Sequence, residues 1–261
     1  MKPCICLICF KPNIIWLDFL TQFHHYDVYV VVDDNAESYK QKYESYSSLK
    51  FVQIPNEECI LNGFLDVNYV IQKKVTGWEK ALYYFSTLDI SSKNVWFIED
   101  DVFFYNEQTL LNIDSKYVES DLLTTNTSYK QNLTGRKNDW LWDKVYMKIP
   151  PPYYKCLCSV VRMSSPMLQT IKTYANTHKT LSFMEALFPT LCNQASLAYA
   201  RPSEFDTVVW RTFYADDACN RLNLYHPVKH IERHLVLRRM IAAKSFSTFL
   251  IEEGSLNVGQ S

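Results

Sequence analysis

Three consecutive acids follow directly on an apolar segment. Glu99, Asp100 and Asp101 come after the apolar residues 95–98, and the apolar residues 102–104 follow them. Adjacent carboxylates repel one another, so this run makes chemical sense where a hard divalent cation, Mn²⁺ or Mg²⁺, supplies the missing positive charge. An acidic turn at the end of a strand is the alternative. Acidic surface runs normally end in polar residues, and the apolar context on both sides favours a metal site.

A second pair of acids follows another apolar segment. Asp33 and Asp34 come directly after the apolar residues 28–32. The carboxyl ends of parallel strands meet at one edge of a sheet, where open α/β folds bind their ligands. Two acid-tipped strands at that edge therefore predict a ligand site. The alternative is an ordinary strand-ending turn, because Asp and Asn side chains hydrogen-bond their own backbone at such positions.

Histidines far from these acids in the sequence offer a further ligand. His226, His230 and His234 are spaced at i, i+4 and i+8, which suits one face of a helix or resembles a zinc cluster. Pro227 makes the helical arrangement doubtful and holds His226 in a stiff turn. Imidazole binds Mn²⁺ acceptably, and His226 is the favoured ligand.

A sheet of buried strands is needed to position these side chains. Short continuous apolar runs are typical of strands that are covered on both faces. We predict strands at residues 4–10, 28–32, 51–54, 95–98, 121–126 and 157–161. Helical segments between the early strands make β-α-β units, which imply a parallel, right-handed α/β layer.

Apolar spacing predicts the helices of the N-terminal half. Residues 14–23 suit a helix between the first two strands. A second helix precedes the strand at 95–98, because apolar residues recur on one of its faces. These residues are Trp78, Ala81, Leu82, Phe85 and Leu88.

Capping residues and proline predict the later helices. Ser164 begins one helix. Another begins at Ser182, whose spacing to Glu185 fits a capping box, and Pro189 is expected to kink or end that helix early. Residues 231–250 form a predicted basic terminal helix.

Composition excludes several classes of phosphate-binding protein. The chain of 261 residues contains only five glycines, against a usual content of about 7%. A Walker A loop, a G-x-G-x-x-G turn and a G-x-S-x-G elbow all need closely spaced glycines, so none of them is present. The formal net charge of −1 provides no global field for nucleic acid or anionic lipid, and no nucleic-acid partner is expected.

The eight cysteines are expected to be free thiols, because the chain is long and apolar enough not to need a disulfide framework. The sequence shows no leader peptide and no apolar stretch near 18 residues, so we expect a cytoplasmic protein without a stable membrane anchor. A short amphipathic contact with a membrane through residues 233–239 remains an alternative.

The acid-tipped strands and the helix between them resemble the nucleotide-binding half of GT-A glycosyltransferases, over about residues 1–105. The E-D-D motif is similar to that of the N-acetylglucosaminyltransferase I type. The resemblance implies that Asp101 holds Mn²⁺ or Mg²⁺ against the donor diphosphate, with Glu99 and Asp100 facing the donor ribose and sugar. It implies that Asp33 or Asp34 contacts the base, and that a distant histidine, His226, completes the metal site.

The same resemblance suggests further donor and catalytic residues. Lys80, on the helix face opposite the Trp78 stripe, is a candidate for phosphate contact, although a solvated lysine is the default. An inverting transfer needs a carboxylate that takes the proton of the acceptor hydroxyl. Glu185 is the first candidate, in even competition with its role in the capping box, and Asp217 is the second.

The acceptor is expected at residues 136–154, because flat aromatic faces pack against sugar rings. The aromatic residues of this loop are Trp140, Trp142, Tyr146, Tyr153 and Tyr154. Core filling is the alternative for each of them.

Taken together, the sequence predicts a single GT-A domain over residues 1–250, with a mixed, mainly parallel sheet flanked by helices. Residues 1–105 form its nucleotide-binding half, 106–250 its acceptor half, and 251–261 a tail. The predicted reaction is metal-dependent, inverting transfer from a nucleotide-sugar, UDP-sugar by default, to a saccharide or glycan acceptor. The alternatives are a sugar-phosphate nucleotidyltransferase and a catalytically silent binding module of the same fold.

Overall fold

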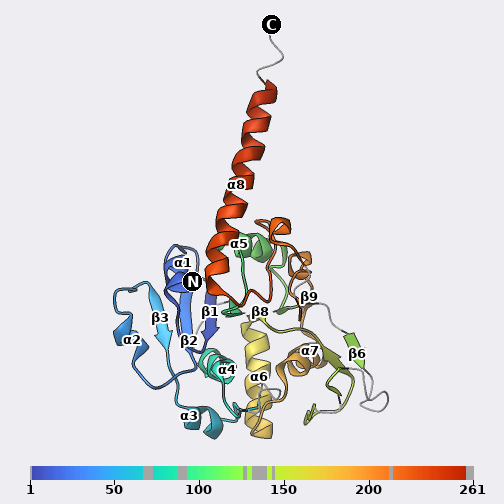
Figure 1. The fold of residues 1–261 in the computed structure, drawn as a ribbon. Helices are drawn as coiled ribbons and strands as arrows, with labels where there is room; N and C mark the ends of the chain where they lie inside the picture. The colour runs from blue at the N-terminus through green and yellow to red at the C-terminus, as the bar shows by residue number, and fades with distance from the viewer. Residues whose placement is uncertain are drawn as a thin grey trace.

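A seven-stranded sheet with the order β3-β2-β1-β4-β8-β5-β9 forms the centre of the molecule (Figure 1). Four neighbouring strands, β3, β2, β1 and β4, are parallel, and β8 is antiparallel to both of its neighbours. The computed structural model describes residues 2–66, 73–87, 93–125, 128–130, 140–142, 145–211 and 214–256. The predicted fold class, a mixed and mainly parallel sheet flanked by helices, is confirmed.

The strands of this sheet are short and lie in two groups along the chain. The parallel group is β1 (Cys4–Cys9), β2 (Asp27–Val32), β3 (Leu49–Val52) and β4 (Asn94–Glu99). The other group is β5 (Leu122–Leu123), β8 (Val160–Ser164) and β9 (Tyr199–Ala200). A separate antiparallel pair consists of β6 (Ser128–Lys130) and β7 (Tyr153–Lys155).

Eight α-helices lie in the part of the chain that the structure describes. The N-terminal ones are α1 (Ile14–Leu20), α2 (Tyr39–Lys42), α3 (Asn56–Leu61), α4 (Gly77–Thr87) and α5 (Glu107–Lys116). The C-terminal ones are α6 (Ser165–His178), α7 (Met184–Gln194) and α8 (Ile231–Leu256). Two short 3₁₀ turns, η3 (Ser203–Phe205) and η4 (Asp216–Ala218), precede α8.

The two faces of the sheet carry separate cores, because alternate residues of each buried strand point to opposite faces. Cys6 and Phe97 belong to the core that includes residues of α4, α6 and α7. Leu7 and Trp96 belong to the core that includes residues of α1 and α5. Burial on both faces explains why the parallel strands are continuous apolar runs in the sequence.

The predicted strands at 4–10, 28–32 and 95–98 match β1, β2 and β4 closely. The others are displaced: the run at 51–54 overlaps the end of β3, that at 121–126 contains the two-residue β5, and that at 157–161 overlaps the start of β8. All eight cysteines are free and buried, in agreement with the prediction.

Ser164 caps α6 as predicted, since its side chain accepts a hydrogen bond from the Met167 amide. The predicted capping box at Ser182 is wrong. Helix α7 has Phe183 as its N-cap, without a side-chain cap bond. Glu185 is therefore not occupied by the capping role that competed with catalysis.

Pro189 lies inside α7, which continues to Gln194, so the prediction that proline ends this helix early is wrong. Proline has no amide hydrogen to donate to the carbonyl four residues earlier. That carbonyl belongs to Glu185, and it accepts a hydrogen bond from the Cys156 amide at 2.9 Å instead. The segment after β7 thus satisfies the backbone group that the proline leaves free.

Helix α8 extends away from the body of the molecule (Figure 1). Its backbone is helical to Leu256, so residues 251–256 of the predicted tail are helical. His226 and His230 precede this helix, which removes the arrangement of three histidines on one helical face. No described helix has the length and apolar character needed to cross a membrane. Leu88, predicted in the stripe of α4, lies outside the described residues.

Candidate functional site

The candidate site lies at the carboxyl ends of the parallel strands. Glu99 is the last residue of β4, and its amide donates to the carbonyl of Ser159 at 3.0 Å, just before β8 begins. Asp33 follows β2, which is separated from β4 by β1 alone. The prediction that both acidic clusters lie at one sheet edge is therefore confirmed by the strand order and direction.

Glu99, Asp101 and His226 form a group whose ligand atoms lie within 4.8 Å of one another. Asp101 Oδ1 is 3.4 Å from Nε2 of His226. The same oxygen is buried and has no hydrogen-bond partner. A buried carboxylate oxygen that accepts no hydrogen bond is costly, and a bound cation removes that cost.

Backbone pairing brings His226 to the acids across more than a hundred residues. The backbones of Phe103 and Tyr225 exchange two hydrogen bonds of 2.8 Å, and the Val228 amide donates to the carbonyl of Asp101 at 2.7 Å. The imidazole is then fixed from both sides. Its Nδ1 lies 2.8 Å from the Val209 carbonyl, and its Nε2 lies 3.0 Å from Ser159 Oγ.

The electrostatics of this group fit a missing positive charge. Burial, and then the charge of Asp101, raise the pKa of Glu99 above its usual range. Desolvation within the acidic loop, followed by the charge of Asp101, raises the pKa of Asp100 to about 6. Carboxylates and one imidazole are donors that Mn²⁺ accepts, and the residues present therefore fit a divalent cation.

Two tryptophans hold the acidic loop in place with their indole N–H groups. Trp78 Nε1, from the first turn of α4, donates to Glu99 Oε1 at 2.7 Å. Trp16 Nε1, from α1, donates to the carbonyl of Asp100 at 2.8 Å. The side chain of Asp100 itself is exposed. Neither contact was predicted, because the apolar periodicity of a helix shows which face is buried and not where one indole nitrogen points.

Lys80 is fully buried, in contrast to the expected open face of its helix. Its ammonium lies 3.0 Å from Asp33 Oδ1 and also donates to the Asp33 carbonyl. Helix α4 begins against the end of β1, where a Cβ on Gly77 would lie 2.7 Å from the Ile8 side chain. The first turn of α4 is therefore packed closely against β1. Lys80 contacts Asp33 at the sheet edge and is not solvated.

Asp34 faces the other side of the same loop. Its Oδ2 accepts a 2.6 Å hydrogen bond from the Tyr39 hydroxyl, and its Oδ1 accepts from the Ala36 amide at 3.2 Å. The Lys11 ammonium lies 3.6 Å away. The hydrogen bond from Tyr39 is the largest influence that lowers the pKa of Asp34. The Asp34 carboxylate is thus bound within the turn that follows β2, as in the structural alternative given for it above.

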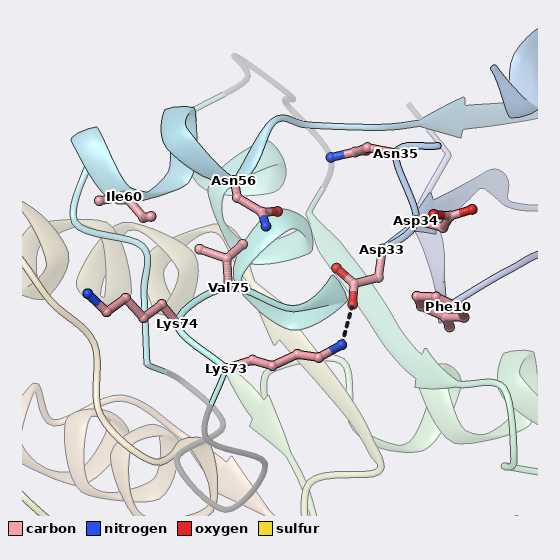
Figure 2. Close-up of a pocket in the computed structure, with 9 residues that line it drawn as sticks. All are labelled: Phe10, Asp33, Asp34, Asn35, Asn56, Ile60, Lys73, Lys74 and Val75. Carbon is pink, nitrogen blue, oxygen red and sulfur yellow. Dashed lines mark ion pairs between the residues drawn. The ribbon is translucent and has the colours of Figure 1, made fainter. Parts of the chain in front are cut away.

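A cavity of about 350 Å³ opens beside Asp33 and Asp34 (Figure 2). Lys73 extends toward Asp33, with 3.9 Å between the charged atoms, whereas Lys74 extends away from it (Figure 2). Phe10 is 57% exposed at the cavity, and the ammonium groups of Lys11 and Lys73 lie 5.6 and 5.7 Å from the centre of its ring. The remaining lining residues are Asn35, Asn56, Ile60 and Val75. Phe10 was missed because it was assigned to the end of a strand.

Glu185 lies in the first turn of α7 and is buried. Burial, and then the charge of Glu99, raise the pKa of Glu185 to about 7, while a hydrogen bond from Trp140 and the charge of His226 lower it. Glu185 therefore lies close enough to Glu99 and His226 for their charges to influence its pKa. A carboxyl group with this pKa exchanges a proton at neutral pH, as a general base requires.

Asp217 lies elsewhere on the molecule. It is exposed on η4, and its carbonyl accepts a hydrogen bond from Lys244 of α8. Its neighbour Asp216 pairs with Arg233. The described contacts connect this turn with α8, and none of them connects Asp217 with Glu99 or Asp101.

The predicted acceptor loop divides into buried and accessible aromatic residues. Trp142 and Tyr153 are buried, and the Tyr153 hydroxyl donates to the Ile149 carbonyl, so these two fill the core. Trp140 is partly exposed and stacks on Phe183, the N-cap of α7. Tyr146 is 72% exposed and Tyr154 partly so. Residues 136–139, 143 and 144 of this loop lie outside the described part of the chain.

Solved glycosyltransferase structures share the fold. An active-site mutant of LgtC, a galactosyltransferase, gives a TM-score of 0.50 at 9% identity, over 90% of this chain and 94% of that one. Mouse xyloside xylosyltransferase 1 gives 0.46 at 8% identity, over 86% and 96%. A 4-diphosphocytidyl-2C-methyl-D-erythritol synthase from Anaerococcus prevotii DSM 20548 gives 0.43 at 11% identity, over 77% and 87%.

No protein-family model and no curated protein sequence matches the chain. At identities near 10%, the structural likeness shows the fold alone. The fold is that of the GT-A glycosyltransferases, and the activity must be argued from the site.

Proposed function

We propose that this protein is a metal-dependent glycosyltransferase. It transfers a sugar from a nucleoside diphosphate donor, with UDP as the default, to a hydroxyl of a saccharide or glycan acceptor. The observation that carries this proposal is the cluster of Glu99, Asp101 and His226, in which a buried oxygen of Asp101 accepts no hydrogen bond. The strand order supports the proposal, because only β1 separates β4, which ends at this cluster, from β2, which ends at the cavity beside Asp33.

The donor nucleoside occupies the cavity beside Asp33. Phe10 offers an aromatic face to the base, and Asp33 and Asn35 offer hydrogen-bonding groups to the base and ribose. Lys80 holds the Asp33 carboxylate in one orientation before the donor arrives, because its ammonium is buried against it. Preorganised polar groups lose less conformational entropy on binding.

Glu99, Asp101 and His226 would hold the divalent cation. When bound, this cation neutralises the diphosphate and stabilises the charge that grows on the leaving oxygen. The chain provides no glycine-rich phosphate loop, so neutralisation of the phosphates falls to this cluster and the nearby lysines. Ser159 and the Val209 carbonyl fix the imidazole of His226 for that task.

Glu185 acts as the general base of an inverting transfer. It takes the proton of the acceptor hydroxyl while that oxygen attacks the anomeric carbon from the side opposite the departing diphosphate. Its pKa of about 7 suits this proton transfer at neutral pH. Asp217 is the second candidate for this role, and its exposed position on η4 makes Glu185 the stronger one. The acceptor ring lies against accessible aromatic side chains: Trp140, which stacks on Phe183 at the start of α7, and the exposed Tyr146.

Release of nucleoside diphosphate tests the proposal. The purified protein is incubated with Mn²⁺ and each of a panel of nucleotide-sugars, with and without simple saccharide acceptors. Asp101→Ala serves as the site variant and Glu119→Gln, at an exposed acid, as the surface control. Release by the wild type and not by the Asp101 variant supports the proposal. Equal release by both removes the metal site, and nucleotide binding without any donor turnover favours a silent binding module.

A further inference from the structure

Trp78 combines a rigid setting with a direct contact to the metal cluster. Its indole ring is 3% exposed and packs against Phe97 and Phe188, with ring centroids 6.0 Å away in both cases. Because the indole packs against both phenylalanine rings, the direction of its N–H group is fixed. That N–H donates to Oε1 of Glu99 at 2.7 Å, a short charge-assisted hydrogen bond.

The start of α4 fixes the backbone of Trp78 as well. The Thr76 amide and hydroxyl both donate to Glu79 Oε2, at 2.7 and 2.6 Å. The same hydroxyl accepts from the Trp78 amide at 3.2 Å. Gly77 lies against Ile8 with no room for a Cβ. Trp78 is therefore held by a capped helix end pressed onto β1, and its position does not depend on Glu99.

The chemistry of the donor matters at a cation site. An indole N–H is a neutral donor with no acceptor capacity. It orients a carboxylate without cancelling its negative charge, whereas a lysine in the same place competes with the metal ion for that charge. Each carboxylate oxygen has two lone pairs, so the bond to Trp78 leaves Glu99 able to bind an ion.

We propose that Trp78 is a positioning residue that holds the Glu99 carboxylate in the geometry a divalent cation needs, and so raises the cation affinity of the cluster. This inference rests on the proposed metal site and goes beyond it by naming the residue that sets its strength. Groups that orient metal ligands typically contribute a factor of about 10 to 100 in metal affinity.

Titration of the protein with Mn²⁺ tests this proposal without any sugar donor or acceptor. The electron paramagnetic resonance signal of the free ion measures how much Mn²⁺ remains unbound. The site variants are Trp78→Phe and Trp78→His. Both replace the indole by a smaller ring, and only the histidine ring has an N–H group that can donate a hydrogen bond. Trp96→Phe is the matched control, because Trp96 is likewise a buried tryptophan, and its indole donates to the Asp114 carboxylate at 3.2 Å, in the other core.

We expect Trp78→Phe to weaken Mn²⁺ binding about 10-fold or more, Trp78→His to recover part of that loss, and Trp96→Phe to bind as the wild type does. Wild-type affinity in Trp78→Phe overturns the inference and leaves the metal site standing. Absence of Mn²⁺ binding in the wild type overturns the proposed metal site itself, together with this inference.

A measurement on the wild type covers the case in which the variants do not fold. Coupling between two sites is reciprocal, so if the indole bond favours cation binding, the cation favours the indole bond. Saturating Mg²⁺ should therefore slow hydrogen exchange of the Trp78 indole several-fold, with its resonance assigned through contacts to Phe97 and Phe188. The Trp96 indole should exchange at an unchanged rate. Equal exchange of Trp78 with and without Mg²⁺ overturns the inference.

Discussion

The acidic residues at the ends of two strands, β2 and β4, have opposite electrostatic surroundings. At the end of β2, Asp33 is already neutralised by Lys80, whose side chain is fully buried. At the end of β4, Glu99 is held by the neutral indole of Trp78, and Asp101 Oδ1 is buried without a hydrogen bond. Among the ion pairs of the described residues, none joins a lysine or arginine to Glu99 or Asp101.

The acids at the end of β2 have a positive charge from the chain itself, whereas those at the end of β4 have none from a lysine or arginine among the described ion pairs. A carboxylate with a built-in cation can orient a neutral ligand such as a base or a ribose. Carboxylates held by neutral donors keep their full charge for a metal ion. Breaking each region should therefore have distinct effects: on chemistry at the end of β4, and on folding and nucleotide binding at the end of β2.

The largest effect is expected from Asp101→Ala. Loss of this ligand removes the cation from the leaving group, which typically costs several kcal/mol in the transition state. We expect kcat/KM for donor turnover to fall about 1000-fold, with the thermal midpoint of unfolding unchanged or raised, because a buried unpartnered oxygen is lost. Steady-state release of nucleoside diphosphate measures this. A decrease in kcat/KM of less than about 10-fold would indicate that other residues bind the cation.

Lys80→Met should act mainly on stability. It leaves the Asp33 carboxylate, 16% exposed, without its buried partner. Breaking one side of a buried pair costs about 3 kcal/mol of unfolding free energy. Urea unfolding measures the loss, and the Lys80→Met, Asp33→Asn double variant should recover most of it. A loss as large in the double variant as in the single one contradicts the account of this pair.

Glu185→Gln should lower kcat by about 100-fold with a smaller change in KM, as expected for loss of a general base. Asp217→Asn is the matched change at an exposed acid and should alter kcat less than about twofold. A larger loss in the Asp217 variant would exchange the two roles. The pH profile supplies an independent check, because the wild-type rate should fall as protonation of Glu185 removes the base.

A stability prediction follows from the raised pKa of Glu185. The folded protein binds this proton more tightly than the unfolded chain, since the pKa rises from 4.5 to about 7. The stabilising effect of the proton is complete below pH 4.5 and is lost as the pH rises through about 7. Between about pH 5 and about pH 8 the wild type should therefore lose roughly 2 kcal/mol relative to Glu185→Gln. The same difference in unfolding free energy between the two proteins at both pH values would contradict the raised pKa.

The sequence predicted the fold through its apolar runs. Residues 28–32 and 95–98 are covered on both faces of the sheet, so their composition alone identifies them as strands, and their order along the chain gives the parallel arrangement. The same reasoning places Asp33 and Glu99 at one edge. Strands with few residues in the sheet, such as β5, give too short a pattern to locate their ends.

The parts that escaped prediction depend on contacts between distant segments. Lys80 is buried against Asp33 at the end of β2, a contact that helical periodicity does not contain. The continuation of α7 through Pro189 follows from an amide of Cys156 that takes up the freed carbonyl. Local patterns describe the neighbours within one element, and these contacts join different elements.

Crystals grown with a nucleoside diphosphate and Mn²⁺, with diffraction recorded at the manganese absorption edge, test the central claim most directly. The account predicts one anomalous peak bound by Glu99, Asp101 and His226, with the phosphates on the ion and the base in the cavity beside Asp33. A nucleotide in that cavity without manganese at Asp101, or an ion held by other residues, would contradict it.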